Sequence, residues 1–127
     1  MSVVPTVGAV VTWTRTFTEA EVRAFAELSG DKGAHHIETD ERGRLMVHGL
    51  LTASLPTKLG GDMDYMAREM HFTFLKAVWT GDELSCEGRV DAVVAKPGRL
   101  KARMSFRIIN QDGDAVLQGT TVGIVRR

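Results

Sequence analysis

The fold is decided by residues 99–125, which read RLKARMSFRIINQDGDAVLQGTTVGIV. Apolar side chains occupy alternate positions in the first part of this stretch: Leu100, Ala102, Met104, Phe106 and Ile108. A period of two is typical of a β-strand that buries one face. Asp112-Gly113 then predicts a tight turn, because these residues accept the backbone angles that join antiparallel strands. We therefore expect residues 99–109 and 115–125 to form a β-hairpin.

Other segments of the chain carry the same strand signal. Residues 66–74 alternate with a period of two, and residues 83–94 form a further strand after the turn at Thr80-Gly81-Asp82. A first strand is expected near the start of the chain, over residues 10–17. The second half of the chain is thus predicted to be four antiparallel strands.

Two helices are predicted between the first strand and the others. Thr18-Glu19-Ala20-Glu21 is a capping box, which starts a helix that Gly30 ends. Residues 49–59 are almost uncharged and predict a buried helix, which Pro56 is expected to kink or end early. Because the apolar face of a sheet must be covered, we expect an α+β fold in which a curved antiparallel sheet wraps around a long central helix.

The composition is that of an ordinary globular chain, 43% apolar and 25% charged over 127 residues. This length predicts one domain spanning residues 1–127. Sixteen basic residues balance sixteen acidic ones, which argues against a nucleic-acid-binding protein. The sequence has neither a run of about 20 apolar residues nor a signal-peptide pattern, so we expect no membrane association and no export. The single cysteine, Cys86, favours a cytoplasmic location and is expected to be an inert, small apolar residue.

Titratable side chains are concentrated in residues 31–44, which are expected to form a loop. Asp31 and His36 would converge only if the backbone between them bends, and Gly33 could supply that bend. A carboxylate beside an imidazole is a useful pair for acid–base chemistry near neutral pH. The alternative is that Asp31 caps the preceding helix while the two histidines, His35 and His36, are solvated.

His48-Gly49 lies where the central helix is expected to begin. The first amides of a helix have free N–H groups, and the positive end of the helix dipole lies behind them. Such groups could bind a carbonyl oxygen as it gains negative charge. The alternative is an ordinary helix start in which Gly49 permits close packing.

Most of the chain, from about residue 8 to residue 125, resembles the MaoC-like, R-specific enoyl-CoA hydratases, which have the hot-dog fold. The resemblance is strongest in residues 25–55 and rests on these stretches: Phe25-Ala26-Glu27-Leu28-Ser29-Gly30-Asp31, then His36, then His48-Gly49-Leu50-Leu51-Thr52-Ala53-Ser54, and later Phe72-Thr73-Phe74-Leu75 with Gly81-Asp82. It implies a single hot-dog domain, the architecture that the periodicity also predicts.

The resemblance also implies a role for each candidate site residue. Family members place an aspartate, four residues and then a histidine after the first helix, which makes Asp31 and His36 the catalytic pair. Gly49 falls where the family polarises the thioester carbonyl, and Ser54 matches a serine that lines the pocket. His48, beside Gly49, is assigned with them to substrate binding.

The implied reaction is the reversible addition of water to a trans-2-enoyl thioester of CoA or acyl carrier protein, giving the (R)-3-hydroxyacyl thioester. The chain would then be a hydro-lyase that needs no cofactor and no metal. Two departures from the family pattern concern the loop. Gly33-Ala34 replaces the usual Asn-Pro, and the segment from His36 to His48 is shorter than in typical members.

Three other functions are considered. A hot-dog acyl-thioesterase commonly uses a carboxylate or amide on the central helix, and residues 49–59 contain none, although Glu69 lies just beyond. A protein that binds acyl thioesters without catalysis is the second. The third is a metal site formed by His35, His36, Glu38 and His48, whose spacing matches no common zinc motif.

A hot-dog sheet leaves a long edge unpaired, and an unpaired edge favours association with another chain. We therefore expect a symmetric homodimer whose two sheets join edge to edge. The resemblance implies that each pocket lies at the boundary between the two subunits.

Overall fold

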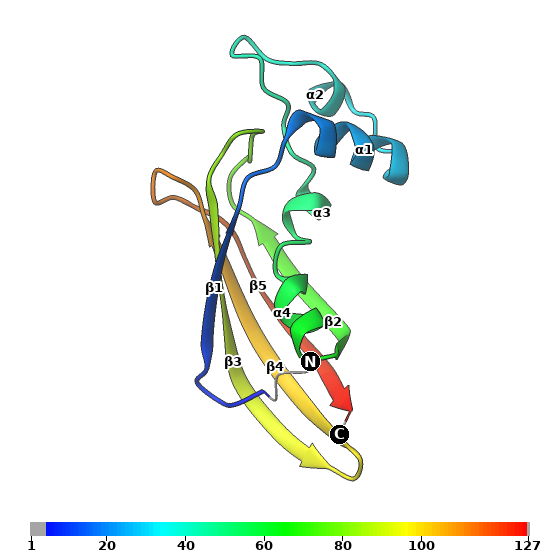
Figure 1. The fold of residues 1–127 in the computed structure, drawn as a ribbon, viewed down its shortest axis with the longest axis vertical. Helices are drawn as coiled ribbons and strands as arrows, with labels where there is room; N and C mark the ends of the chain where they lie inside the picture. The colour runs from blue at the N-terminus through cyan, green and yellow to red at the C-terminus, as the bar shows by residue number, and fades with distance from the viewer. Residues whose placement is uncertain (1–4, 127) are drawn as a thin grey trace.

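The computed structural model describes residues 5–126, which contain one curved antiparallel sheet (Figure 1). Its strands are ordered β1–β3–β4–β5–β2 across the sheet, so β1 and β2 are the edges. The strands are β1 (Val10–Arg15), β2 (Tyr65–Phe74), β3 (Leu84–Lys96), β4 (Arg99–Ile109) and β5 (Ala115–Arg126). The predicted hairpin of residues 99–125 is confirmed as β4 and β5, and the curved antiparallel sheet of the predicted α+β fold is confirmed with it.

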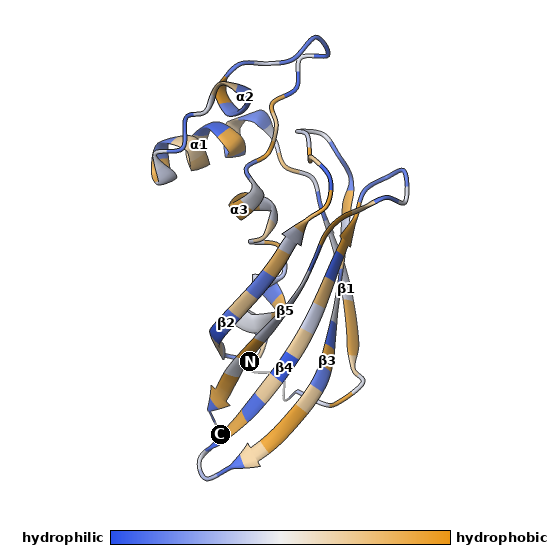
Figure 2. Ribbon diagram, turned by 180° about the vertical axis from the view of Figure 1, so that it is seen from behind, coloured by the Kyte–Doolittle hydropathy of each residue, from blue (hydrophilic) through white to orange (hydrophobic). Residues whose placement is uncertain are grey.

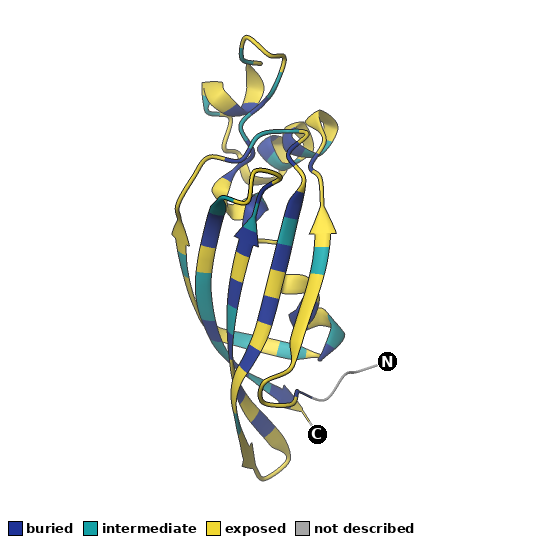
Figure 3. Ribbon diagram, turned by 90° about the vertical axis from the view of Figure 1, so that its left-hand side faces the viewer, coloured by how far each residue is buried: buried dark blue, intermediate teal, exposed yellow. Residues whose placement is uncertain are grey.

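Alternation along the strands separates the two faces of the sheet. Apolar and polar bands alternate along β3 and β4 in Figure 2, and buried and exposed bands alternate in Figure 3. The five apolar residues that define the period of β4 are all buried: Leu100, Ala102, Met104, Phe106 and Ile108. They line the core together with Leu55 and Leu59 of the central segment. The inner face of the sheet therefore packs against this segment, as its apolar sequence predicts.

The first helix, α1 (Glu19–Ser29), has the ends that its sequence predicts. The Thr18 hydroxyl accepts a hydrogen bond from the Glu21 N–H at 3.2 Å, and the Glu21 carboxylate accepts one from the Thr18 N–H at 2.9 Å. At the other end Gly30 has φ 80°, a left-handed conformation that glycine adopts at little cost. The capping box and the terminal glycine are thus both confirmed, and they fix the point at which Asp31 leaves the helix.

The central helix is shorter than the long helix expected and is broken in two, α3 (Gly49–Thr52) and α4 (Thr57–Asp62). Pro56 has no N–H group and cannot continue an α-helical hydrogen-bond ladder. In the turn around it, the N–H groups of Ser54, Leu55 and Thr57 donate to carbonyls three residues back rather than four. The predicted interruption at Pro56 is therefore confirmed.

Residues 31–44 are less irregular than the polar sequence predicts, because they contain a single helical turn, α2 (Ala34–Ile37). The rest of the segment is held by Asp40, whose carboxylate accepts hydrogen bonds from the N–H groups of Arg42 and Arg44. The helices α1 and α2 lie beyond one end of the sheet, with α3 next to them (Figure 1). Among the described residues, no helix has the length and apolar character needed to cross a bilayer.

Candidate active site

The turn between α1 and α2 brings Asp31 and His36 together, with Asp31 Oδ2 3.7 Å from His36 Nε2. The bend has a local cause. Asp31 Oδ1 accepts a hydrogen bond from the Gly33 N–H at 3.2 Å, and the Gly33 carbonyl accepts one from the His36 N–H at 2.8 Å. The φ of Gly33 is −53°, so this glycine does not adopt a left-handed backbone conformation. A Cβ there would lie 3.0 Å from His35 Cε1, so the glycine permits close packing of that ring.

His36 is held in one orientation by the main chain. Its ring is buried, and Nδ1 lies 2.6 Å from the carbonyl oxygen of Met46. A carbonyl only accepts hydrogen bonds, so Nδ1 must carry the proton of the neutral ring. The lone pair of the neutral ring is therefore on Nε2, the nitrogen that faces Asp31. This tautomer makes Nε2 the atom able to take a proton.

The spacing of the pair suits a shared water molecule. A distance of 3.7 Å between Nε2 and Oδ2 is longer than a direct hydrogen bond, which needs about 2.7–3.2 Å. One water oxygen can nevertheless lie within hydrogen-bond reach of both atoms. The Asp31 side chain is 58% exposed, so water reaches it freely, whereas the His36 side chain is only 6% exposed. The pair thus combines an accessible carboxylate with a fixed imidazole.

His48 lies against the pair rather than facing open space. Its ring stacks on that of His36, with centroids 3.7 Å apart and planes inclined by 14°, and its Nε2 donates to the carbonyl oxygen of Asp31 at 2.9 Å. Phe25 contacts the His48 ring edge-on at 4.8 Å. His48 is 2% exposed. This burial favours a supporting role over the direct substrate contact that the resemblance implies.

Gly49 is the first residue of α3 and lines a pocket of about 310 Å³. Met46, Thr52, Phe74 and Val78 contribute to the same lining. A Cβ on Gly49 would lie 3.1 Å from Phe74 Cε1, so close packing favours a glycine here. The space beside Gly49 is thus filled by the Phe74 ring, which supports the packing explanation, while the oxyanion explanation concerns the N–H group of Gly49.

The structure does not bring Ser54 into this cluster. Ser54 is exposed in the turn between α3 and α4, and its hydroxyl donates to the carbonyl of Leu51 at 2.5 Å. It lines a separate depression with Trp13 and Lys58. Glu69, the residue on which a thioesterase would depend, is exposed on the edge strand β2.

Asp31, His36 and His48 also offer three possible metal donors, whose atoms lie within 4.8 Å of one another. An imidazole binds a metal through a lone pair in the plane of its ring. Because the two rings are nearly parallel and 3.7 Å apart, an ion in the plane of one ring lies well outside the plane of the other. The arrangement of these two rings therefore does not suit a shared metal ion. The cluster also differs from the set of His35, His36, Glu38 and His48 that the sequence suggested, because it contains Asp31 and lacks His35 and Glu38.

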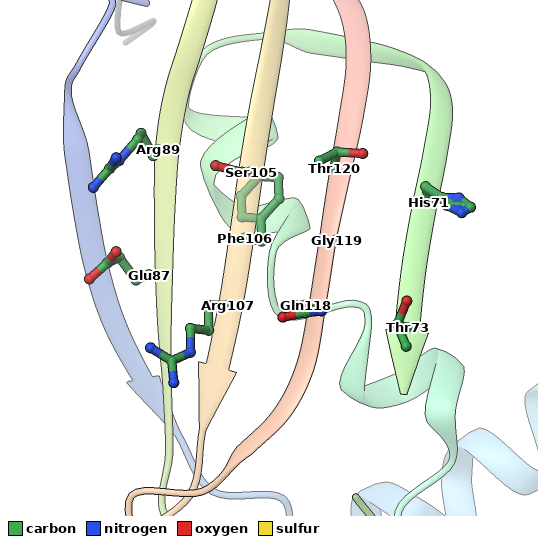
Figure 4. A pocket seen from close by; sticks show the side chains of 10 residues that line it. All are labelled: His71, Thr73, Glu87, Arg89, Ser105, Phe106, Arg107, Gln118, Gly119 and Thr120. Carbon is green, nitrogen blue, oxygen red and sulfur yellow. The ribbon is translucent and has the colours of Figure 1, made fainter. Parts of the chain in front are cut away.

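A larger depression lies on the opposite, outer face of the sheet (Figure 4). Its polar lining includes Glu87, Arg89 and Arg107, which are exposed and point away from α3 and α4. The Asp31–His36 pair does not contribute to it. This depression is a solvated surface of alternating polar residues, which is what the outward face of an antiparallel strand normally presents.

Cys86 is the only thiol and lies in β3 with no exposed surface. Burial raises the pKa of this thiol to about 12, so it stays protonated at neutral and mildly alkaline pH. We expect Cys86 of the native protein to resist a thiol-specific disulfide reagent at pH ~8 and to react fully once denaturant unfolds the chain. Rapid reaction of the native protein would contradict the inert role assigned to this residue.

Comparison with known proteins agrees with this geometry. The strand order, the curved sheet and the short central helix define the hot-dog class of proteins. No family model matches the chain. It is, however, 32% identical to the (R)-specific enoyl-CoA hydratase of Aeromonas caviae, over 91% of this chain and 92% of the relative. The chain therefore belongs to the (R)-specific enoyl-CoA hydratase family, a family of hydro-lyases.

Two further similarities support this assignment. The solved structure of the Aeromonas caviae (R)-hydratase matches with a TM-score of 0.83 and 29% identity, covering 96% of this chain and 97% of that one. A mitochondrial 3-hydroxyacyl-[acyl-carrier-protein] dehydratase of Solanum lycopersicum is 24% identical over 94% of this chain and 76% of its own length. The family resemblance read from the motifs is thus confirmed.

Proposed function

We propose that this chain adds water reversibly to trans-2-enoyl thioesters, with Asp31 and His36 as the catalytic residues. The observation that carries the proposal is the 3.7 Å separation of Asp31 Oδ2 and His36 Nε2, with the tautomer of His36 set by the Met46 carbonyl. The names of two relatives, a hydratase and a dehydratase, describe the two directions of this reaction.

In the proposed mechanism, one water molecule lies between the carboxylate and the imidazole. It donates one hydrogen bond to Asp31 Oδ2 and the other to His36 Nε2, and it loses a proton to the pair as its oxygen bonds to C3. The C2–C3 double-bond electrons move toward the thioester oxygen, which the N–H group of Gly49 would stabilise. The pair then returns a proton to C2, so the thioester stays intact. Fixed orientation of this water supplies much of the rate.

The first test is an assay of the wild-type protein with crotonyl-CoA, longer enoyl-CoAs and enoyl-acyl carrier protein. We expect the enoyl absorbance to fall and chiral analysis to find the (R)-3-hydroxyacyl thioester. Release of free CoA without hydration would instead identify a thioesterase. Saturable binding with neither product would identify a protein that binds thioesters without catalysis.

We also propose that the protein is a homodimer joined through β2. This strand is an edge of the sheet, and among the described residues no strand pairs with its outer side. The support is a group of large apolar side chains on and beside this strand, each about half exposed: Met66, Met70, Phe74 and Leu75. Leu50 of α3, next to Gly49, is 71% exposed. A second copy would cover these side chains and place each pocket at the subunit boundary.

Light scattering coupled to size exclusion tests this proposal. We expect a dimer at micromolar concentration for the wild type and a shift toward monomer for Met70→Arg, because a buried, unpaired charge is costly. Val94→Arg on β3 is the matched control, since Val94 is also about half exposed but lies away from β2. A monomeric wild type, or equal effects of the two variants, would contradict the dimer.

Two coarser expectations complete the proposal. We propose that residues 1–127 act as one hot-dog domain, because both halves of the described chain contribute to one core cluster. We propose a cytoplasmic location, which the single cysteine favours.

A further inference from the structure

We propose that His48 is a positioning residue, which holds Asp31 and His36 at the spacing that hydration requires. This inference rests on the proposed function, but it assigns His48 a role other than substrate binding. The support is that one buried imidazole contacts both members of the pair, through a hydrogen bond to one and ring stacking on the other.

The hydrogen bond fixes the main chain of Asp31. Nε2 of His48 donates to the Asp31 carbonyl oxygen at 2.9 Å, and this carbonyl belongs to the residue that carries the reactive carboxylate. The Asp31 side chain itself is more than half exposed, so little packing surrounds it. The bond from the buried ring of His48 therefore restrains Asp31 at its backbone.

The stacking contact fixes the ring plane of His36. His48 covers one face of the His36 ring, with the ring centroids 3.7 Å apart and the planes inclined by 14°. The hydrogen bond from Nδ1 to Met46 sets the direction in which the ring points. The nearly parallel ring of His48 packs against its face and limits the tilt of the ring plane, so Nε2 stays directed at Asp31.

His48 also ties the pair to the start of α3. It is the residue that precedes this helix, and its carbonyl accepts a hydrogen bond from the Thr52 N–H at 3.0 Å. The edge contact from Phe25 links it to α1. The same residue therefore sets the position of the catalytic pair relative to Gly49, the next residue in the chain and the proposed contact of the thioester oxygen.

Two variants of His48 separate the two contacts. His48→Phe keeps an aromatic ring but has no donor for the Asp31 carbonyl, and His48→Gln keeps an N–H donor at a similar reach but has no ring. We expect His48→Phe to lower kcat for hydration by about 10- to 100-fold with KM changed by less than about two-fold, because small misplacements of reacting groups cost rate. We expect the decrease in kcat to be smaller for His48→Gln than for His48→Phe, because the glutamine keeps the hydrogen bond to Asp31.

His35→Phe is the matched control, because His35 is exposed and contacts the His36 ring without bonding to Asp31. It should keep kcat within about two-fold of the wild type. A folded His48→Phe variant with unchanged kcat would overturn the inference while leaving the proposed function intact. So would a variant in which only KM rises, since this would indicate substrate contact.

A spectroscopic readout keeps the inference testable without activity. In nitrogen-15 spectra of the wild type, we expect the His48 ring proton on Nε2 and the His36 ring proton on Nδ1, both protected from exchange. His48→Gln should shift the His36 ring signals and weaken their protection. A wild-type His48 that lacks a protected Nε2 proton would overturn the inference even if no substrate were ever hydrated.

Discussion

Asp31→Asn and His36→Gln are each expected to lower kcat for enoyl-thioester hydration by about 10²- to 10⁴-fold, the usual contribution of a positioned acid or base. An asparagine amide in place of the Asp31 carboxylate would not accept a proton, and a glutamine amide in place of the His36 imidazole has no basic nitrogen. Both replacements are close to the native side chains in size, so KM should change little. Steady-state kinetics with crotonyl-CoA measures both effects.

Controls for these variants lie in the same segment. Glu27→Gln removes an exposed carboxylate of α1, and His35→Phe removes the imidazole adjacent to His36. Both should retain nearly full activity. Because Asp31 and His36 act on the same water molecule, their effects should not add. The kcat of the double variant Asp31→Asn/His36→Gln should be close to that of the slower single variant. Either single variant with more than a tenth of wild-type kcat would contradict the assigned mechanism.

Gly119→Ala and Gly123→Ala are expected to be the most destabilising single-methyl changes in the sheet. A Cβ at Gly119 would lie 2.3 Å from the backbone oxygen of His71, and one at Gly123 would lie 2.3 Å from that of Met66. Both oxygens belong to β2, so the clash can be relieved only by moving the edge strand itself. We expect each variant to lower the free energy of unfolding by about 3 kcal/mol or more, the upper range for overpacking.

Chemical denaturation monitored by tryptophan fluorescence measures these losses, and Gly61→Ala provides the control. Gly61 lies in α4 with open space around its added Cβ. Alanine is the better helix former, so this variant should be as stable as the wild type or slightly more so. A Gly119→Ala protein of wild-type stability would mean that β2 does not pack against β5 as described.

Local periodicity was sufficient to predict the strands, although the first one ends at Arg15 rather than at residue 17. The five alternating apolar residues of β4 define both its limits and its buried face, and the predicted range of residues 99–109 is the observed one. The capping box at Thr18 likewise depends on residues three positions apart, so its effect is visible in the sequence. Features set by neighbours in the chain are the ones that sequence patterns report.

The support of the candidate site could not be predicted in this way. His36 is oriented by the carbonyl of Met46, and the Asp31 carbonyl is bonded by His48, seventeen residues away. Every residue has a backbone carbonyl, so the sequence does not indicate which one will bond to His36. The stacking of two histidines that are far apart in the chain does not follow a sequence periodicity either. Only the family resemblance predicted that Asp31 and His36 lie together, and it gave no indication that the His48 ring packs against them.

Isotope labelling tests the central claim most directly. The protein is incubated with trans-2-enoyl-CoA in water enriched in oxygen-18, and the product is analysed by mass spectrometry. If Asp31 and His36 deliver water to C3, the label appears in the hydroxyl of an intact (R)-3-hydroxyacyl-CoA and is lost in the Asp31→Asn variant. Label in a free carboxylate, with CoA released, would contradict the account.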